Sequence, residues 1–268
     1  MLKSQLKSDG EYMTIFDSII LGIIEGFTEF LPISSTGHLI IASEFLGIDQ
    51  NSVTNAYHVI IQFAAIFAVV FNYKDKFTIK KISLWSKVFL AFLPLAAVGF
   101  IFSDQIKELF SIKIVAIMFI VGGVIFIVVE KFFILNETKQ IDDVEKVTIK
   151  QSLVIGFAQV FALIPGTSRA GSTIIGALLV GLSRKASAEF SFLLAFPAMS
   201  AVTAYDLLKH YHEFSHANLI TLAVGFLVSF IVAYFTIKLL LVFLEKFTFV
   251  AFGIYRIVFG IILLLIFN

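Results

Sequence analysis

The stretch EGFTEFLPISSTGH, from Glu25 to His38, combines two carboxylates, four hydroxyl side chains and a histidine between the apolar flanks IILGII (19–24) and LIIA (39–42). The whole chain of 268 residues is 59% hydrophobic and 15% charged, whereas soluble domains carry about 25% charged residues. This composition predicts an all-α integral membrane protein that crosses the bilayer several times. The net charge of +1 predicts no bulk attraction to nucleic acid, and the lack of cysteine excludes disulfides and thiolate metal sites.

Two apolar regions, 14–47 and 151–182, are interrupted in the middle by LPISSTG and IPGTSRAG. Each half is short for a bilayer core, which requires about 20 apolar residues per helix. Non-helical backbone at membrane depth is tolerated only where protein or a wet cavity covers it, so both regions are expected to form re-entrant helix–loop–helix hairpins. Six full transmembrane helices are expected at 53–71, 85–102, 112–130, 187–204, 217–241 and 249–267.

The two predicted hairpins resemble each other, and each is followed by three of the predicted spans. Placing Pro32 over Pro165 aligns the hydroxyl pair 34–35 with the hydroxyl pair 167–168. Paired apolar segments broken by Gly or Pro in corresponding halves indicate an inverted-topology repeat with a site near the bilayer midplane. We therefore expect one polytopic membrane domain over 1–268, with repeats over about 14–130 and about 151–268.

Lysine and arginine are unevenly divided between the two predicted sides of the membrane. One side holds twelve and the other five, and cytoplasmic loops carry the excess of these residues. Both termini and the mouth of the first hairpin are therefore expected on the outer side, with a site that opens to the outer face. The twelve are Lys74, Lys76, Lys80, Lys81, Lys87, Lys131, Lys139, Lys146, Lys150, Arg184, Lys185 and Lys246, and the five are Lys3, Lys7, Lys107, Lys113 and Lys209.

Glu25 and Glu29 are four residues apart and therefore share one face of a helix. A carboxylate at the centre of a membrane helix costs roughly 2.5–3.5 kcal/mol on insertion scales, so the pair must face protein, a cation or water. A capping or snorkelling pair and a structural hydrogen-bond pair are the plain interpretations. Two carboxylates on one face also suit a divalent cation such as Mg²⁺ or Ca²⁺, and without a metal one of them can act as a general base.

The residues Ser34, Ser35 and Thr36 follow Pro32 at the expected start of the second half-helix. Unpaired backbone N–H groups at a helix start favour an anion. One serine could simply cap the helix, but capping needs one hydroxyl and not three. His38 lies one turn beyond Ser35, which favours a functional role for its imidazole over a purely structural one.

The break in the second predicted hairpin includes PGTSRAGST (165–173), which contains the only arginine deep in a predicted hairpin, Arg169. Its guanidinium stays charged and needs an anionic partner. That partner is either Glu25 or Glu29, in a structural ion pair, or a ligand phosphate cradled together with Thr167 and Ser168. Arg256, near the start of the last span, is instead expected to snorkel to the interface.

The predicted midplane therefore gathers carboxylates, hydroxyls, a histidine and an arginine. These groups supply a nucleophile, a cation site and charge stabilisation, as phosphoryl transfer requires. The apolar surroundings favour a phosphate carried by a lipid. A transporter with the same midplane site is the alternative that the residues leave open.

EGFTEFLPISSTGH and PGTSRAGST together resemble the two signature motifs of the bacterial undecaprenyl-diphosphatase, or bacitracin-resistance protein, family. EFSFLLAFPAM (189–199) and GIYR (253–256) extend the resemblance, which runs from about residue 14 to the end of the chain. It implies an integral inner-membrane enzyme that removes a phosphate from undecaprenyl diphosphate and regenerates the carrier lipid for peptidoglycan synthesis. Because bacitracin binds the same lipid diphosphate, surplus enzyme implies resistance.

The resemblance also implies roles for single residues. Ser35 and His38 are the two implied nucleophiles, of which Ser35 is favoured. The implied partners are undecaprenyl diphosphate and the bilayer, without nucleic acid, and the formation of a homodimer stays open. The family motifs fall on Glu25, Glu29, Ser34, Ser35, Thr36, His38, Ser168 and Arg169.

The orientation is testable because the chain contains no cysteine. In whole cells, an impermeant thiol reagent should label Ser4→Cys, which is expected outside, and should spare Ser83→Cys, which is expected in the cytoplasm. Permeabilised cells, in which both positions should react, provide the control. Labelling of Ser83→Cys but not of Ser4→Cys in intact cells would reverse the predicted topology.

Overall fold

The computed structural model describes residues 13–49, 51–132, 139–209 and 219–267. Within these ranges the chain is helical, and the only pairing of extended backbone is an isolated bridge between Ile141 and Leu182. The helices are α1 (Ile15–Thr28), α2 (Ser35–Leu46), α3 (Ser52–Asn72), α4 (Ile82–Ile101), α5 (Ser103–Glu108), α6 (Ile112–Phe132), α7 (Ile149–Val160), α8 (Arg169–Leu179), α9 (Arg184–Lys209), α11 (Leu219–Leu244) and α12 (Val250–Ile266), with short 3₁₀ turns η1 (Ile79–Lys81), η3 (Val144–Lys146) and η4 (Phe161–Leu163).

Several of the described helices are long and apolar enough to cross a membrane, and they coincide with five of the six predicted spans. The sixth, α12, has 17 residues, fewer than the about 20 that a bilayer core requires, so a sixth full crossing stays a prediction. Large apolar side chains such as Phe100 and Leu265 are 85% and 77% exposed, which suits a surface that faces lipid. The protein is a multi-pass membrane protein with five candidate spans, Val53–Asn72, Ile79–Ile101, Ile112–Phe132, Arg184–Tyr205 and Leu219–Leu244.

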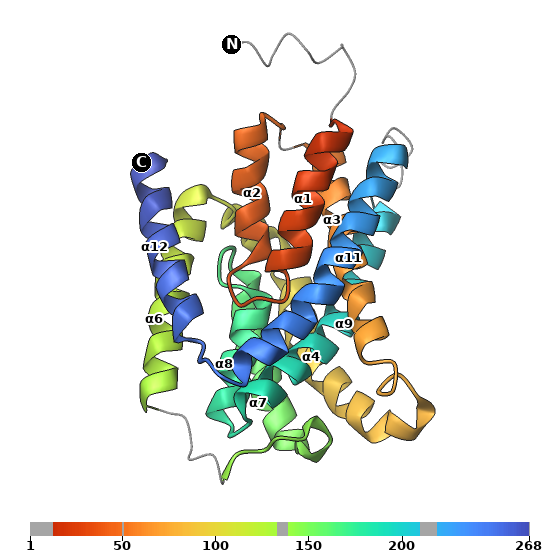
Figure 1. The fold of residues 1–268 in the computed structure, drawn as a ribbon, viewed down its shortest axis with the longest axis vertical. Coiled ribbons are helices and arrows are strands. Elements are labelled where there is room, and N and C mark those ends of the chain that lie inside the picture. The colour runs from red at the N-terminus through yellow and green to blue at the C-terminus, as the bar shows by residue number, and fades with distance from the viewer. Residues whose placement is uncertain (1–12, 50, 133–138, 210–218, 268) are drawn as a thin grey trace.

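Both interrupted regions form two short helices joined by a loop, as the prolines and hydroxyl clusters predict. α1 and α2 make up the first hairpin, and α7, η4 and α8 make up the second. Figure 1 shows the first hairpin at the end of the molecule where α12 finishes and the second near the other end, with their loops pointing toward each other. The two loops, 29–34 and 164–168, are called the first and second tips below.

The two hairpins share local features at a constant separation of 134 residues. Thr14 and Thr148 both begin a helix with a capping box. Ser34 and Ser168 both precede a helix with positive φ, 68° and 76°. These features match Ser34 with Ser168, which differs by one residue from the predicted alignment of Pro32 with Pro165.

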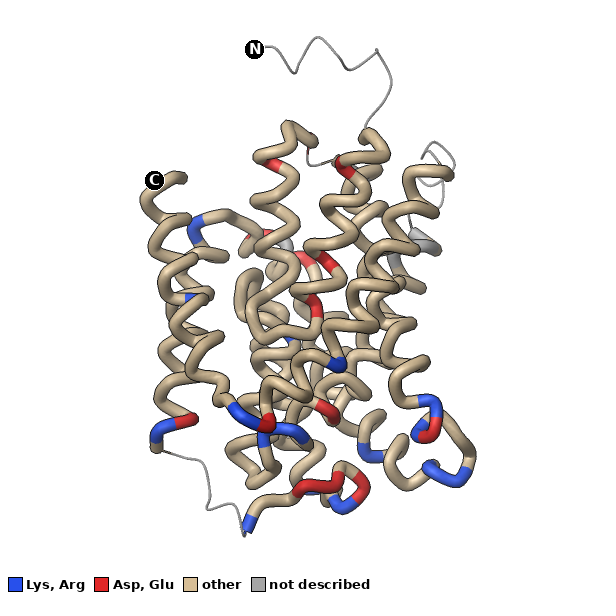
Figure 2. Tube along the Cα trace, in the orientation of Figure 1, with Lys and Arg blue, Asp and Glu red and all other residues tan. Residues whose placement is uncertain are grey.

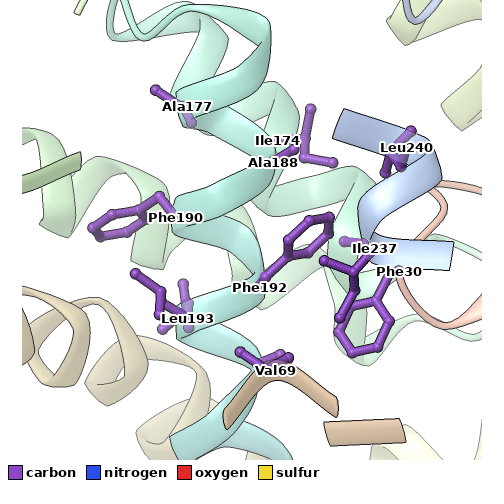
Figure 3. Packing of buried hydrophobic residues seen from close by; sticks show 14 of the residues in the cluster. Phe30, Val69, Ile174, Ala177, Ala188, Phe190, Phe192, Leu193, Ile237 and Leu240 are labelled. Atoms are coloured by element: carbon purple, nitrogen blue, oxygen red, sulfur yellow. The ribbon is translucent and has the colours of Figure 1, made fainter. Parts of the chain in front are cut away.

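The main hydrophobic core surrounds α9, and the first tip packs against it. Phe190, Phe192 and Leu193 of α9 are fully buried, and they pack among side chains from α3, α8 and α11 (Figure 3). Phe30 of the first tip joins this core and meets Phe192 edge to face, with ring centroids 5.2 Å apart. Such an aromatic pair adds about 0.5–1.5 kcal/mol to the burial of its area, so it holds the first tip against α9.

Figure 2 shows that lysine and arginine gather at one end of the molecule, where the loops from α3 to α4, α6 to α7, α8 to α9 and α11 to α12 lie. This is the grouping of loops that the topology predicts, although Lys3 and Lys7 lie outside the described residues. At this end Glu145 accepts hydrogen bonds from Lys81 and Lys76, at 2.5 and 2.9 Å. These bonds, the one from Lys81 first, lower the pKa of Glu145 to about 2, so the loop before α7 stays paired with the loop after α3 at neutral pH.

Replacing Gly156 with alanine should lower the thermal stability of the protein. A Cβ at this position would lie 2.9 Å from Ala91 Cα, so α7 and α4 would have to separate, and overpacking of this kind costs about 1–3 kcal/mol. The midpoint of thermal unfolding in detergent should fall by several degrees. Gly99→Ala is the matched control, because a Cβ there meets only Leu163 Cδ2, at an ordinary 3.5 Å. Equal midpoints for the two variants would show that α4 and α7 are not in close contact.

Candidate active site between the two hairpin tips

Three predicted site residues from the two hairpins form one chain of contacts at the tips. Ser35 Oγ donates a hydrogen bond to Glu29 Oε2 at 2.6 Å. Arg169 Nη2 donates to the other oxygen, Glu29 Oε1, also at 2.6 Å. Glu29 therefore orients a serine hydroxyl with one oxygen and holds a guanidinium with the other.

Local backbone geometry explains why these side chains converge. Glu29 directly follows α1, and Ser35 is the first residue of α2, so the five-residue turn between them brings both to the first tip. Ser34 has positive φ and makes no capping bond with its side chain. Ser168, its equivalent, accepts a bond from the N–H of Gly171 at 3.0 Å and does cap α8. The simple capping interpretation therefore holds for the serine of the second tip but not for that of the first.

Arg169 begins α8 and reaches across to the first hairpin. Besides Glu29, it donates from Nη1 to the carbonyl of Ser191 at 3.0 Å. Thr173, one turn further along α8, shares a hydrogen bond of 2.6 Å with the hydroxyl of Ser191, which secures the same part of α9. Arg169 Nε has no hydrogen-bond partner among the described residues. The ion pair that the sequence left as one of two alternatives is present, and the Nε–H of the guanidinium is not used by it.

A cavity of about 270 Å³ opens beside this cluster. Its polar lining includes most of the predicted site residues, and Gln62 of α3 adds an amide. Leu95, Met199 and Val202 supply apolar walls, and Ile106 and Phe110 come from the segment that joins α4 to α6. An anion in this cavity would meet a guanidinium, hydroxyls and the starts of two helices at once. The predicted residues in its lining are Glu29, Ser34, Ser35, Thr36, Ser168 and Arg169.

Glu25 lies one turn before Glu29 and is fully buried, and both of its carboxylate oxygens lack a hydrogen-bond partner among the described residues. A buried carboxylate without partners is costly, and a bound cation is one way to offset that cost. The described residues contain no group of three or more acidic, histidine or cysteine side chains around a common point. Mg²⁺ commonly binds one or two carboxylates and takes its other ligands from water and substrate phosphates, so Glu25 and Glu29 fit such a cation.

His38 lies apart from the cavity that holds Ser35. Its Nδ1 is 2.8 Å from the carbonyl oxygen of Ser34, and its Nε2 is 2.6 Å from the hydroxyl of Tyr255. The imidazole stacks on Phe259, with centroids 4.7 Å apart, and lines a separate apolar cavity of about 590 Å³ between the first hairpin and α12. His38 touches the site through the backbone of Ser34, and its ring nitrogens bond to Ser34 and Tyr255 and not to Ser35.

Thr167 is likewise absent from the lining of the central cavity. Its side chain lines a third cavity of about 410 Å³, together with Ser172 and residues of α6. Neither hydroxyl has a hydrogen-bond partner among the described residues. Of the predicted phosphate-binding residues, Thr167 is therefore the one whose side chain the fold turns away from Arg169.

Arg256 does not snorkel, and the expectation that it does was wrong. Its side chain is fully buried and donates hydrogen bonds to backbone carbonyls of both tips, including those of Pro32 and Thr167. Arg256 lies about two turns inside α12. This depth was the sequence signal that its guanidinium could not easily reach the interface. Sequence reasoning missed this residue because all its partners are backbone atoms from distant segments.

Comparison with known proteins places these features in a family. The family model described as bacitracin resistance protein BacA matches residues 18–262. A protein of Sulfurimonas denitrificans named undecaprenyl-diphosphatase is 77% identical over 256 residues, which is 96% of this chain and 100% of the relative. Proteins with the same name from a Sulfurovum species and from Methanococcus aeolicus are 63% and 49% identical, each over 95% of this chain and 100% and 99% of the relative. The matched region contains both tips, the central cavity and Arg256, and the chain belongs to the bacitracin resistance protein BacA family.

Proposed function

We propose that the protein is an undecaprenyl-diphosphate phosphatase, which converts undecaprenyl diphosphate to undecaprenyl phosphate and phosphate and so recycles the carrier lipid of cell-wall synthesis. The observation that carries this proposal is the serine hydroxyl bonded to a carboxylate that is itself paired with an arginine, beside a cavity within an apolar helical protein. The names of the relatives agree with it. Removal of the diphosphate that bacitracin binds would also confer resistance to that antibiotic.

The contacts suggest how the residues act. Ser35 Oγ attacks the terminal phosphorus while its proton passes to Glu29 Oε2, to which it is already hydrogen-bonded. The bond from phosphorus to the bridging oxygen breaks, and the lipid phosphate leaves with the electron pair. Water then hydrolyses the phosphoserine, releasing phosphate and restoring the hydroxyl. His38 stays the alternative nucleophile, although it borders a different cavity.

The guanidinium of Arg169 stabilises the charge that develops on the phosphoryl oxygens. Its Nε is available for this contact, and Nη2 can be shared between Glu29 and the phosphate. Ser34, Thr36 and Ser168 line the same cavity and complete the cradle. Thr167, which was predicted to join them, would have to turn its side chain from the third cavity to do so.

A divalent cation, Mg²⁺ or Ca²⁺, is the proposed cofactor, and Glu25 and Glu29 would hold it. When bound, such an ion neutralises negative charge on a diphosphate. The buried oxygens of Glu25, which have no hydrogen-bond partner among the described residues, support this assignment.

The proposed architecture is a single domain of six full spans and two re-entrant hairpins, related as inverted repeats over about 14–130 and 151–268. The shared features at a separation of 134 residues support the repeat, as does the packing of α1 on α11 and of α7 on α4. The proposed location is the bacterial cytoplasmic membrane, with the Lys-rich end inside. The site would then open outward, on the side of Ile106 and Phe110. Homodimer formation is an additional proposal.

Phosphate release in detergent separates this enzyme from a transporter or flippase with the same midplane site, because a micelle has no compartments. The purified protein should release phosphate from undecaprenyl diphosphate when Mg²⁺ or Ca²⁺ is supplied. Ser35→Ala should lose nearly all of this activity, whereas Ser43→Ala, also buried on α2 but bonded to His58, should retain it. Binding of the lipid without phosphate release under any metal would contradict the enzyme and favour the transporter.

The Glu29–Arg169 pair should stabilise the fold and act in catalysis, and the two roles can be separated. Removing one member of a buried pair costs about 3–5 kcal/mol, because the other charge stays unpaired. Arg169→Ala should therefore unfold at a lower temperature than the double variant Glu29→Ala/Arg169→Ala.

Neither variant should release phosphate, and Arg169→Lys should also lose most activity because an ammonium cannot replace the planar guanidinium. Thermal unfolding and phosphate release, measured on the same preparations, give both results. Recovery of turnover in the double variant would show that the pair is only structural.

A further inference from the structure

Every N–H group of Arg256 is bonded to a backbone carbonyl. A guanidinium has five N–H donors. Nε donates to Phe119 O at 3.3 Å. Nη1 donates to Pro32 O at 3.0 Å and to Thr167 O at 2.9 Å. Nη2 donates to Met118 O at 2.9 Å and to Gly166 O at 3.0 Å.

These carbonyls come from three separate parts of the fold. Pro32 belongs to the first tip, Gly166 and Thr167 belong to the second, and the other two acceptors belong to α6. No carboxylate pairs with Arg256 among the described residues, so its partners are entirely backbone dipoles. Non-helical carbonyls within a membrane protein need donors that the helices cannot provide. A single side chain from α12 meets this need for both tips at once.

Gly122 of α6 makes room for the guanidinium. A Cβ at this position would lie 2.7 Å from Arg256 Cζ and closer still to Nη2. The ring of Phe119 borders the same group, with its centroid 5.4 Å from Cζ. The packing of α6 on α12 is therefore shaped around the guanidinium, and any side chain at position 122 would displace it.

We propose that Arg256 is a positioning residue that holds the two tips at the separation needed for Ser35 and Arg169 to act on one phosphate. This inference rests on the proposed function. Pro32 lies three residues before Ser35, and Thr167 lies two before Arg169, so the hydrogen bonds of Arg256 to the tips fix the backbone on both sides of the site. Because all five N–H groups are used, Arg256 has no donor left for the substrate and acts through geometry. Misplacement of catalytic groups by about 1 Å can cost about 100-fold in rate.

Two variants disturb these bonds in different ways, and a third provides a matched control. Arg256→Lys keeps the charge but has three donors and no planar fork. Gly122→Ala keeps the arginine but displaces its guanidinium. Gly253→Ala crowds the same pair of helices, since its Cβ would lie 2.9 Å from Gly123 O, but its close neighbours do not include Arg256 or the carbonyls that it binds.

Steady-state phosphate release should fall in kcat by about 100-fold for Arg256→Lys and Gly122→Ala, with KM within about threefold of the original value. Gly253→Ala should keep a kcat close to that of the unaltered protein. A rise in KM at unchanged kcat would mean that Arg256 binds substrate and would overturn the proposal. Equal losses in Gly122→Ala and Gly253→Ala would assign the effect to helix packing and would overturn it as well.

Distances between the hairpins test the same bonds without relying on activity. Phe27 and Phe161 are 48% and 63% exposed, and each lies shortly before one tip. In this cysteine-free chain, spin labels on Phe27→Cys/Phe161→Cys should give a narrow distance distribution. Adding Arg256→Lys or Gly122→Ala should broaden it, and adding Gly253→Ala should not. A distribution that stays narrow in Arg256→Lys would overturn the proposal, and this readout holds even if the unaltered protein releases no phosphate and the proposed function fails.

Discussion

The carbonyl groups of two irregular loops must find hydrogen-bond donors in the middle of an apolar helical protein. Water cannot supply these donors in a bilayer core, and each unsatisfied group costs several kcal/mol. The guanidinium of Arg256 satisfies carbonyls of both tips and of α6 together. These hydrogen bonds link the two broken helices where their tips approach each other beside the central cavity.

The two hairpins share a capping box and a positive-φ serine but carry different chemistry. Counting 134 residues forward, Glu25 corresponds to Gln159, Glu29 to Leu163 and Ser35 to Arg169. The acidic side chains of the first hairpin therefore have neutral equivalents in the second, and the arginine occupies the position of the serine. Because the tips face each other, their opposite charges attract, and Arg169 forms an ion pair with Glu29. A strictly identical pair of tips would instead bring like charges together.

The arrangement also explains why an ion pair and an active site need not be alternatives. The Glu29 carboxylate uses one oxygen for Arg169 and the other for Ser35, so the contact that neutralises a buried charge also orients the hydroxyl. In the proposed function, burial of the pair in a site of low polarity would strengthen its effect on an incoming phosphate. The atoms that would stabilise the fold are the ones that would act on the substrate. A substrate anion would compete with Glu29 for the guanidinium.

Local features of the sequence predicted most of the architecture: apolar stretches of span length, two breaks marked by proline and hydroxyls, and lysines grouped in alternate loops. They also predicted that the two tips meet, while leaving open whether Arg169 pairs with Glu25, Glu29 or a ligand phosphate. The tertiary structure alone decided the register of the hairpins, the turn of His38 and Thr167 toward separate cavities, and the burial of Arg256. Hydropathy and helix breaks depend on neighbouring residues, whereas these outcomes depend on backbone carbonyls and side chains far apart in the sequence, which no local pattern encodes.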